Sequence, residues 1–335
     1  MTTNSIVDVD GIKVGQASDL KALTGCTVVI CEKGAVAGVS QRGGAPGTRE
    51  TDLLRPGHMI QKVHAVLLSG GSAYGLDAAG GVMQYLEEKK IGFQTGATVV
   101  PIVPSAILYD LDLGDHSVRP DKQMGYQACS NASTNRPDEG NFGAGTGATV
   151  GKILGGGQAM KSGIGTASIT IGNGIVIGAM IAVNAFGDVV ENNSIITGVR
   201  TFKKGPVKLG AEEIFADTRE VMLSFAGRQI LSFASRQNTV IGVIATNAIL
   251  TKEEANHLAD VASNGISQAV RPAFTMFDGD TIFALASGKI KADVNLITAY
   301  APDVVSQAIL NGVKAAQSAA GLPAYSDFAS GMAVS

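Results

Sequence analysis

The chain contains no tryptophan, and aromatic residues make up only 5% of its 335 residues. Surfaces that bind nucleic acid need strong positive charge, and those that stack bases also need exposed aromatic side chains. Here 26 Lys and Arg residues stand against 29 Asp and Glu residues, which gives a formal net charge of −3. The composition therefore argues against nucleic acid as a partner.

Cysteines and long apolar runs are also scarce. The three cysteines, Cys26, Cys31 and Cys129, lack the Cys-x-x-Cys spacing of thiolate metal sites, and their odd number predicts a reducing compartment. Residues 1–15 lack the basic start and apolar core of a signal peptide. A membrane span needs roughly 18 apolar residues, and glycines interrupt every run that approaches this length. We therefore expect a cytoplasmic protein that does not act at a membrane.

Several familiar cofactor motifs are incomplete in this chain. Gly151-Lys152 resembles the end of a phosphate-binding loop, but Thr146 replaces a required glycine and Ile153 replaces the required Ser or Thr. The glycines of residues 143–148 lack the clear preceding strand of a dinucleotide fingerprint. No metal-ligand spacing connects the four histidines, which are His58, His64, His116 and His257. We expect neither a metal nor an organic cofactor.

Glycine is the abundant residue, with 43 copies in short clusters between apolar runs. This pattern is typical of tight turns and close backbone approaches in a sheet-rich core. Apolar, β-branched runs predict buried strands over residues 27–31, 63–68, 175–183 and 239–245. Helices are predicted over residues 74–89, after a Thr251–Glu254 capping box, and from a first turn at Pro302. Alternating strands and helices predict a layered α+β or mixed α/β sandwich.

A chemical signal lies where a polar segment meets a buried strand. The segment of residues 201–238 is basic and polar at its start and polar at its end, and Thr239 then opens an apolar run. A threonine at a chain terminus carries a hydroxyl nucleophile and an α-amine, whose unperturbed pKa of about 7.7–8.0 leaves much of it basic. Breaking the Asn238–Thr239 bond would create such a residue. On the residues alone, a threonine here also fits ordinary β propensity.

A set of glycine-rich and polar segments follows in a distinctive order along the chain. They are Val9-Asp-Gly-Ile-Lys-Val-Gly15, Gly44-Ala-Pro-Gly-Thr-Arg-Glu-Thr51, Leu68-Ser-Gly-Gly-Ser-Ala-Tyr-Gly75, Gly143-Ala-Gly-Thr-Gly-Ala-Thr-Val-Gly-Lys152, Lys161-Ser-Gly-Ile-Gly-Thr166, Val183-Asn-Ala-Phe-Gly187, Asn238-Thr-Val-Ile-Gly-Val-Ile-Ala-Thr246 and Phe277-Asp-Gly-Asp-Thr-Ile-Phe283. Together they closely resemble the L-aminopeptidase/D-esterase family, the DmpA-type N-terminal-nucleophile peptidases. The resemblance covers nearly the whole chain.

The resemblance implies an αββα four-layer sandwich over residues 1–335. It also implies self-cleavage into an α subunit of residues 1–238 and a β subunit of residues 239–335, which stay associated, usually in a homotetramer. Thr239 would be the nucleophile both of this cleavage and of turnover. We therefore predict autocleavage at Asn238–Thr239.

The same resemblance implies roles for further residues. Asn184 would donate to the oxyanion, and Lys152 would lie beside the nucleophile and keep its amine neutral by like-charge repulsion. Asp278 and Asp280 would orient the nucleophile and its amine, and Tyr109 would line the active site. Each residue also fits an ordinary structural role: a turn for the Asp-Gly-Asp segment, a strand end for Asn184, a surface charge for Lys152 and a core position for Tyr109.

The Asn-Thr junction and the Asp278-Gly-Asp280 segment set this chain apart from peptidases of β-amino-acid peptides, which cleave before Ser and carry a Ser and a Glu in this region. Both features are closer to the nylon-oligomer and pantetheine-amide hydrolases, and the extra carboxylate could suit a substrate with a free amine. We predict an amidase or aminopeptidase that acts on small peptides, amino-acid amides or ω-amino-acid oligomers through an acyl-enzyme on Thr239. Two alternatives stay open, namely an acyltransferase of the ornithine-acetyltransferase type and an uncleaved binding protein.

Overall fold

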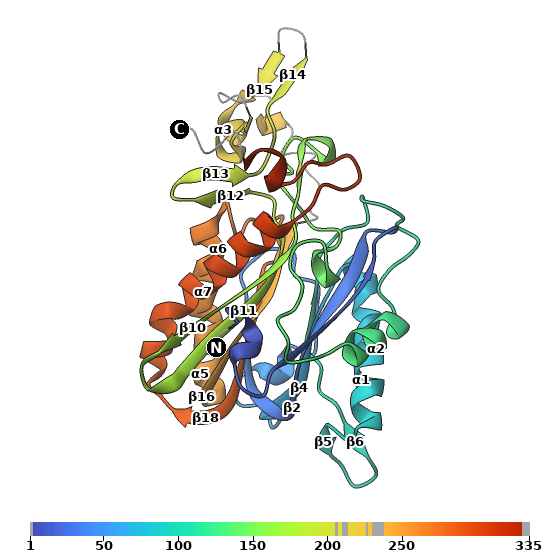
Figure 1. Cartoon of the computed structure of the whole chain (residues 1–335), viewed down its shortest axis with the longest axis vertical. Coiled ribbons are helices and arrows are strands. Elements are labelled where there is room, and N and C mark those ends of the chain that lie inside the picture. Colours follow the sequence, from blue (N-terminus) through green and yellow to red (C-terminus); the bar gives the residue numbers. More distant parts are fainter. Residues whose placement is uncertain (1–2, 205–206, 210–213, 226, 230–237, 330–335) are drawn as a thin grey trace.

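Two layers of β-strands pack face to face, and helices cover the outer side of each layer (Figure 1). The computed structural model describes residues 3–204, 207–209, 214–225, 227–229 and 238–329. The main sheet runs in the order β10-β11-β16-β18-β2-β4-β7-β3, with β1 paired to β2. This arrangement confirms the predicted αββα sandwich.

The first layer carries the predicted nucleophile. It contains β10 (Ile164–Ile171), β11 (Ile175–Asn184), β16 (Thr239–Ile249) and β18 (Thr281–Lys291). Strands β10, β11 and β16 are antiparallel neighbours, whereas β16 and β18 run parallel. Strand β16 is buried on both faces: Ile241 and Val243 point into the centre of the sandwich, while Val240 and Ile244 point toward helices. The strands predicted over residues 175–183 and 239–245 are therefore confirmed.

The second layer is built around one long strand. It contains β1 (Lys13–Asp19), β2 (Thr24–Gln41), β3 (Thr48–Arg49), β4 (Lys62–Ser69) and β7 (Ser105–Ile107). The first half of β2 pairs with β1 and β4, and its last residues pair with β18, so β2 passes from one layer to the other. The prediction of a strand over residues 27–31 found only a short part of it. Glu32 and Lys33 are exposed at an irregularity in the pairing with β4, and this charged interruption hides the continuation.

Helices close the sandwich on both sides. One face is covered by α5 (Lys252–Ala262), α6 (Asn264–Ala269) and α7 (Val294–Ala315), and the other by α1 (Ala78–Glu88) and α2 (Lys122–Ser130) (Figure 1). The Thr251 hydroxyl accepts from the Glu254 N–H and the Glu254 carboxylate accepts from the Thr251 N–H, which confirms the predicted capping box. The helix predicted over residues 74–89 begins as a 3-10 helix, η3 (Ser72–Asp77), and becomes α-helical at Ala78.

The predicted start of the last helix was wrong. Helix α7 begins at Val294, where the Asp293 carboxylate accepts from the Asn295 N–H, and Pro302 lies inside it. Proline is favoured in a first turn because it lacks an N–H, but the Asp293 cap decides the start here. Pro302 is buried against α6, and a Cβ on Gly265 would lie 2.2 Å from the Pro302 carbonyl oxygen.

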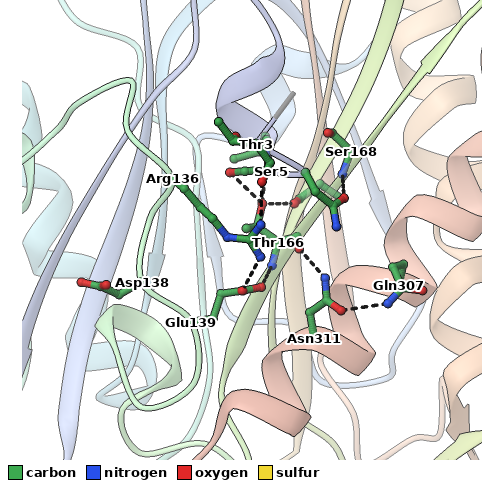
Figure 2. A network of polar contacts seen from close by, with 12 residues as sticks. Thr3, Ser5, Arg136, Asp138, Glu139, Thr166, Ser168, Gln307 and Asn311 are labelled. Atoms are coloured by element: carbon green, nitrogen blue, oxygen red, sulfur yellow. Dashed lines mark hydrogen bonds and ion pairs between the residues drawn. The ribbon is translucent and has the colours of Figure 1, made fainter. Parts of the chain in front are cut away.

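A polar network fastens the first residues of the chain to β10 and α7 (Figure 2). The Thr166 hydroxyl accepts from the Ile6 N–H and donates to the Ala179 carbonyl, while the Thr166 carbonyl accepts from the Asn311 side chain. The Glu139 carboxylate accepts from the Thr166 N–H and pairs with Arg136. Because β10 pairs with β11, this network also steadies the strand that ends at Asn184.

Smaller elements lie beyond the end of the main sheet. They are β12 (Asp188–Glu191), β13 (Ser194–Thr197), β14 (Phe202–Lys204), β15 (Val207–Leu209), β17 (Val270–Arg271) and α3 (Thr218–Leu223), and elsewhere β5 (Phe93–Gln94), β6 (Val99–Val100), β8 (Thr149–Val150) and β9 (Met160–Lys161). Residues 230–237, which form the polar end of the segment before the predicted junction, lie outside the described residues. Within the described part of the chain, no helix has both the length and the apolar character needed to cross a membrane.

Candidate active site

Thr239 is the first residue of β16 and lies opposite Asn184, the last residue of β11. It is only 4% exposed, and its hydroxyl donates to the carbonyl oxygen of Asn238. The nucleophile and the bond that it is predicted to break are therefore in direct contact. The hydroxyl therefore lies beside the carbonyl group that it is predicted to attack.

The loop of residues 274–280 holds the chain on both sides of the Asn238–Thr239 bond. Before the bond, the Asn238 N–H donates to the Phe277 carbonyl at 3.3 Å, and the Asn238 carbonyl accepts from the Gly279 N–H at 2.8 Å. After it, the Val240 N–H donates to the Asp280 carboxylate at 2.7 Å. The predicted acidic pair thus lies at the junction, as the sequence pattern suggested.

Asp278 and Asp280 are both buried, at 1% and 2% exposure, and their oxygens accept hydrogen bonds from the protein itself. Asp280 also accepts from the Phe274 N–H, and Asp278 accepts from the Thr275 N–H and hydroxyl. Burial raises the pKa of both carboxyl groups, and the nearby Asp278 raises the pKa of Asp280 further. Carboxyl groups so enclosed are suited to holding backbone in place.

Asn184 connects the predicted nucleophile to the predicted lysine. Its side-chain carbonyl accepts from the Lys152 ammonium at 2.7 Å and from the Thr149 N–H at 3.0 Å. Its side-chain amide donates to the Tyr109 carbonyl oxygen at 2.9 Å. The register opposite Thr239 brings Asn184 to the junction, while its role as an oxyanion donor stays a prediction.

Lys152 is partly buried, and its ammonium also donates to the Asn184 backbone carbonyl at 3.1 Å. Burial lowers the pKa of Lys152 to about 7, although the charges of Asp278, Asp112 and Asp110 act in the opposite direction. A lysine with this pKa exchanges its proton near neutral pH, which is the property expected of a group that takes part in proton transfer.

A cavity of about 300 Å³ opens beside Lys152 and Thr149. Tyr109 and Asp112 lie on its wall, and the Tyr109 hydroxyl donates to the Asp112 carboxylate at 3.0 Å. Burial, followed by this hydrogen bond, raises the pKa of Tyr109 to about 12, so the phenol stays protonated. Gly155, Gly156 and Leu322 complete one side of a space large enough for a small substrate.

The structure places the predicted site residues close to one another, but the sequence patterns did not predict some of their hydrogen-bond partners. Thr149 donates its backbone N–H to Asn184, and Thr275 donates its hydroxyl to Asp278. Asp112 is exposed, and no sequence motif distinguishes it from other acidic residues. Of the three, Thr149 lies inside a segment that carried the family resemblance, so its position there was the only available signal.

The family is shown by comparison with known proteins. The sequence profile of peptidase family S58 matches residues 4–325. The chain belongs to peptidase family S58. It is therefore a hydrolase of peptide or amide bonds.

Two similar proteins carry the names of different amide-hydrolysing enzymes. An uncharacterised aminopeptidase of Mycobacterium leprae is 41% identical over 96% of this chain and 93% of its own length. A 6-aminohexanoate-oligomer endohydrolase of Kocuria sp. is 29% identical over 92% of this chain and 85% of its own. The resemblance drawn from the sequence motifs is thus confirmed.

Solved structures show the same fold. The L-aminopeptidase D-Ala-esterase/amidase from Ochrobactrum anthropi, described as a variant of the Ntn hydrolase fold, aligns with a TM-score of 0.70 at 20% identity, covering 96% of this chain and 88% of its own. A Burkholderia sp. β-aminopeptidase aligns with a TM-score of 0.68 at 21% identity, covering 99% of this chain and 94% of its own. Both likenesses support the fold of this S58 member.

Proposed function

We propose that this S58 hydrolase cleaves its own Asn238–Thr239 bond and then uses Thr239 as an N-terminal nucleophile. The observation that carries the proposal is the contact between the Thr239 hydroxyl and the Asn238 carbonyl, inside a loop that holds the backbone on both sides. Ordinary β propensity explains a threonine in a strand, but it does not explain why hydrogen bonds hold the backbone on both sides of this one peptide bond.

Turnover would follow from the same groups. The free Thr239 amine takes the proton of its own hydroxyl, the oxygen adds to the substrate carbonyl, and the proton passes to the leaving amine. Lys152 donates to the side chain of Asn184, which lies opposite Thr239 in the sheet. When Lys152 is protonated, its positive charge disfavours protonation of the Thr239 amine. Water then releases the acid from the acyl-enzyme.

The cavity suggests the substrate class. The carboxylates of Asp278 and Asp280 are enclosed, so a substrate ammonium would pair instead with the exposed Asp112, which lies on the cavity wall with Tyr109. Short peptides, amino-acid amides and 6-aminohexanoate oligomers all offer a free amine and an amide within one small molecule. Acetylating the amine of such a substrate should therefore raise its KM. Equal turnover of the acetylated and free forms would argue against an ammonium site.

The test of self-cleavage is the intact mass of the purified protein under denaturing conditions. The wild type should give two chains of about 24 and about 10 kDa, in proportion to the 34.2 kDa of the whole chain, with the break at Asn238–Thr239. Thr239→Ala should remain a single chain and should not hydrolyse amides. Thr246→Ala is the matched control, because Thr246 is a buried threonine of the same strand, and this variant should still be cleaved.

The mass measurement also separates the alternatives. One unbroken chain in the wild type would exclude Thr239 as an N-terminal nucleophile and favour a binding protein. Two chains, with the acyl group captured by an added amine faster than by water, would favour an acyltransferase. The same two chains with release of the free acid support the proposed hydrolase. We further propose that the processed subunits stay associated in a homo-oligomer, which light scattering of the cleaved protein would check.

A further inference from the structure

The Asn238 carbonyl oxygen accepts a second hydrogen bond, which comes from the backbone N–H of a glycine. The N–H of Gly279 donates to it at 2.8 Å, beside the donation from the Thr239 hydroxyl. We propose that the Gly279 N–H is the oxyanion donor both of self-cleavage and of substrate turnover. The inference rests on the proposed function and adds to it a catalytic group and the place of the acyl subsite.

Gly279 is fixed in position from both sides. Its neighbours are held through the Ala45 N–H, which donates to the Asp278 carbonyl at 2.8 Å, and the Arg42 N–H, which donates to the Asp280 carbonyl at 3.0 Å. The enclosed Asp278 and Asp280 side chains add the bonds to Thr275, Phe274 and Val240 described above. A donor held in this way does not need to reorganise as charge develops, which is the requirement for strong oxyanion stabilisation.

The absence of a side chain at this position is also explained. A Cβ on Gly279 would lie 3.0 Å from the Thr239 hydroxyl oxygen and 2.6 Å from the Ala45 carbonyl oxygen. The loop therefore approaches the nucleophile as closely as backbone allows. Asn184, the donor expected from the family resemblance, directs its amide to the Tyr109 carbonyl instead.

In self-cleavage, the Thr239 oxygen forms a bond to the Asn238 carbonyl carbon, and the π electron pair moves to the carbonyl oxygen. The resulting oxyanion faces the Gly279 N–H. The carbon–nitrogen bond then breaks, the Thr239 nitrogen receives the hydroxyl proton, and an ester joins Asn238 to the Thr239 oxygen. Water adds to this ester, the carbon–oxygen bond breaks, and the hydroxyl regains its proton.

The ester formed in self-cleavage and the acyl-enzyme formed in turnover have the same connectivity at Thr239. Both carry an acyl carbonyl on the same oxygen, and both are hydrolysed through a tetrahedral oxyanion at the same place. The substrate's acyl group would therefore occupy the place that Asn238 holds in the uncleaved chain. The Gly279 N–H, released when Asn238 leaves, would bind the substrate carbonyl.

The backbone N–H can be observed without any mutation. The chain contains two Asp-Gly pairs, Asp10-Gly11 and Asp278-Gly279, so protein labelled with ¹³C-carbonyl Asp and ¹⁵N Gly gives two correlated amide signals. Gly11 is distant in sequence and serves as the internal control. A short-chain aminoalkyl boronic acid, added to the processed protein, would form a tetrahedral anionic adduct on the Thr239 oxygen, and the intact mass of the 239–335 chain would report it.

The proposal predicts that the adduct moves the Gly279 amide proton strongly downfield and leaves Gly11 unchanged. An adduct on Thr239 with an unmoved Gly279 signal would overturn this inference and leave the proposed function intact. An uncleaved chain, or no adduct on the 239–335 chain, would overturn the proposed function and this inference with it.

Discussion

Two lysines, Lys152 and Lys161, lie at the small sheet of β8 and β9, and burial lowers the pKa of each to about 7. Their surroundings differ. Lys161 is fully buried and donates to three backbone carbonyls, those of Gly145, Ala148 and Ser162. Lys152 donates to Asn184, lies on the wall of the cavity and is surrounded by the charges of three aspartates.

The comparison shows that a shifted pKa does not by itself identify a catalytic group. Lys161 joins the turn at residues 143–148 to β9, and its three bonds occupy all three donors of its ammonium. Lys152 is connected to the predicted nucleophile through Asn184, and it also lies on the wall of the cavity proposed to hold substrate. We therefore propose that Lys161 supports the fold and that Lys152 takes part in the reaction, and the predictions below test this division.

The largest effect is expected from Lys152→Met. Lys152→Met removes a group whose pKa of about 7 suits proton transfer near neutral pH, so kcat/KM on an amide should fall by about 10²-fold or more, in the range of a lost acid–base group. At pH 7, below the window in which the lowered pKa adds stability, the melting temperature should change little. Steady-state kinetics and thermal unfolding of the same preparation measure both. A variant with unchanged kcat/KM would remove Lys152 from the site.

Lys161→Met should show the opposite pattern. The Gly145 and Ala148 carbonyls keep backbone donors, so the expected loss of unfolding free energy is about 2 kcal/mol, from hydrogen bonds that are no longer made. The fraction that stays folded should keep its kcat/KM. Denaturant unfolding in the uncleaved Thr239→Ala background measures the stability. A stable Lys161→Met protein without activity would invert the comparison.

A further effect is expected in the dependence of stability on pH. A folded pKa of about 7 for each lysine lies below the value of about 10.4 for an exposed lysine, so between these values the unfolded chain binds more protons. Stability contributed by each lysine therefore rises with pH from about 7 to about 10 and is constant below that window. Each Lys→Met variant should thus lose stability relative to its parent as the pH rises through this range. Equal pH slopes in parent and variant would contradict the lowered pKa values.

The smallest effect is expected at the edge of the cavity. Tyr109→Phe removes only the hydrogen bond to the exposed Asp112, a contact worth about 0.5–1.5 kcal/mol, so KM should rise by less than about tenfold with kcat little changed. A large loss of kcat in Tyr109→Phe would place the phenol closer to the reacting atoms than the structure does.

Asp112→Asn should raise KM for substrates with a free amine and leave the KM of acetylated substrates unaffected.

The sequence predicted the buried strands well because continuous apolar runs identify strands that are covered on both faces, as in β16. It failed where a local signal competed with a longer-range one. Charged Glu32 and Lys33 concealed the length of β2, and Pro302 suggested a helix start that the Asp293 cap overrides. Both errors concern the boundaries of elements whose type was correct.

For the site, the ordered motifs brought together Thr239, Asn184, Lys152 and the acidic pair before any geometry was known. They could not show which atoms meet. The Gly279 N–H has no side chain to attract notice, and the two lysines look alike in sequence, each following a glycine-rich stretch. Only the partners of each group separate Lys161, which supports the fold, from Lys152, which we propose takes part in the reaction.

The most direct test of the account is to trap the acyl-enzyme. Cleaved protein is mixed with an activated ester or amide of a short amino acid, quenched in acid within the turnover time, and its intact mass is measured. The account predicts that the 239–335 chain gains the mass of the acyl group and that peptide mapping locates it at Thr239. Acylation of the 1–238 chain, or turnover by protein that remains a single chain, would contradict it.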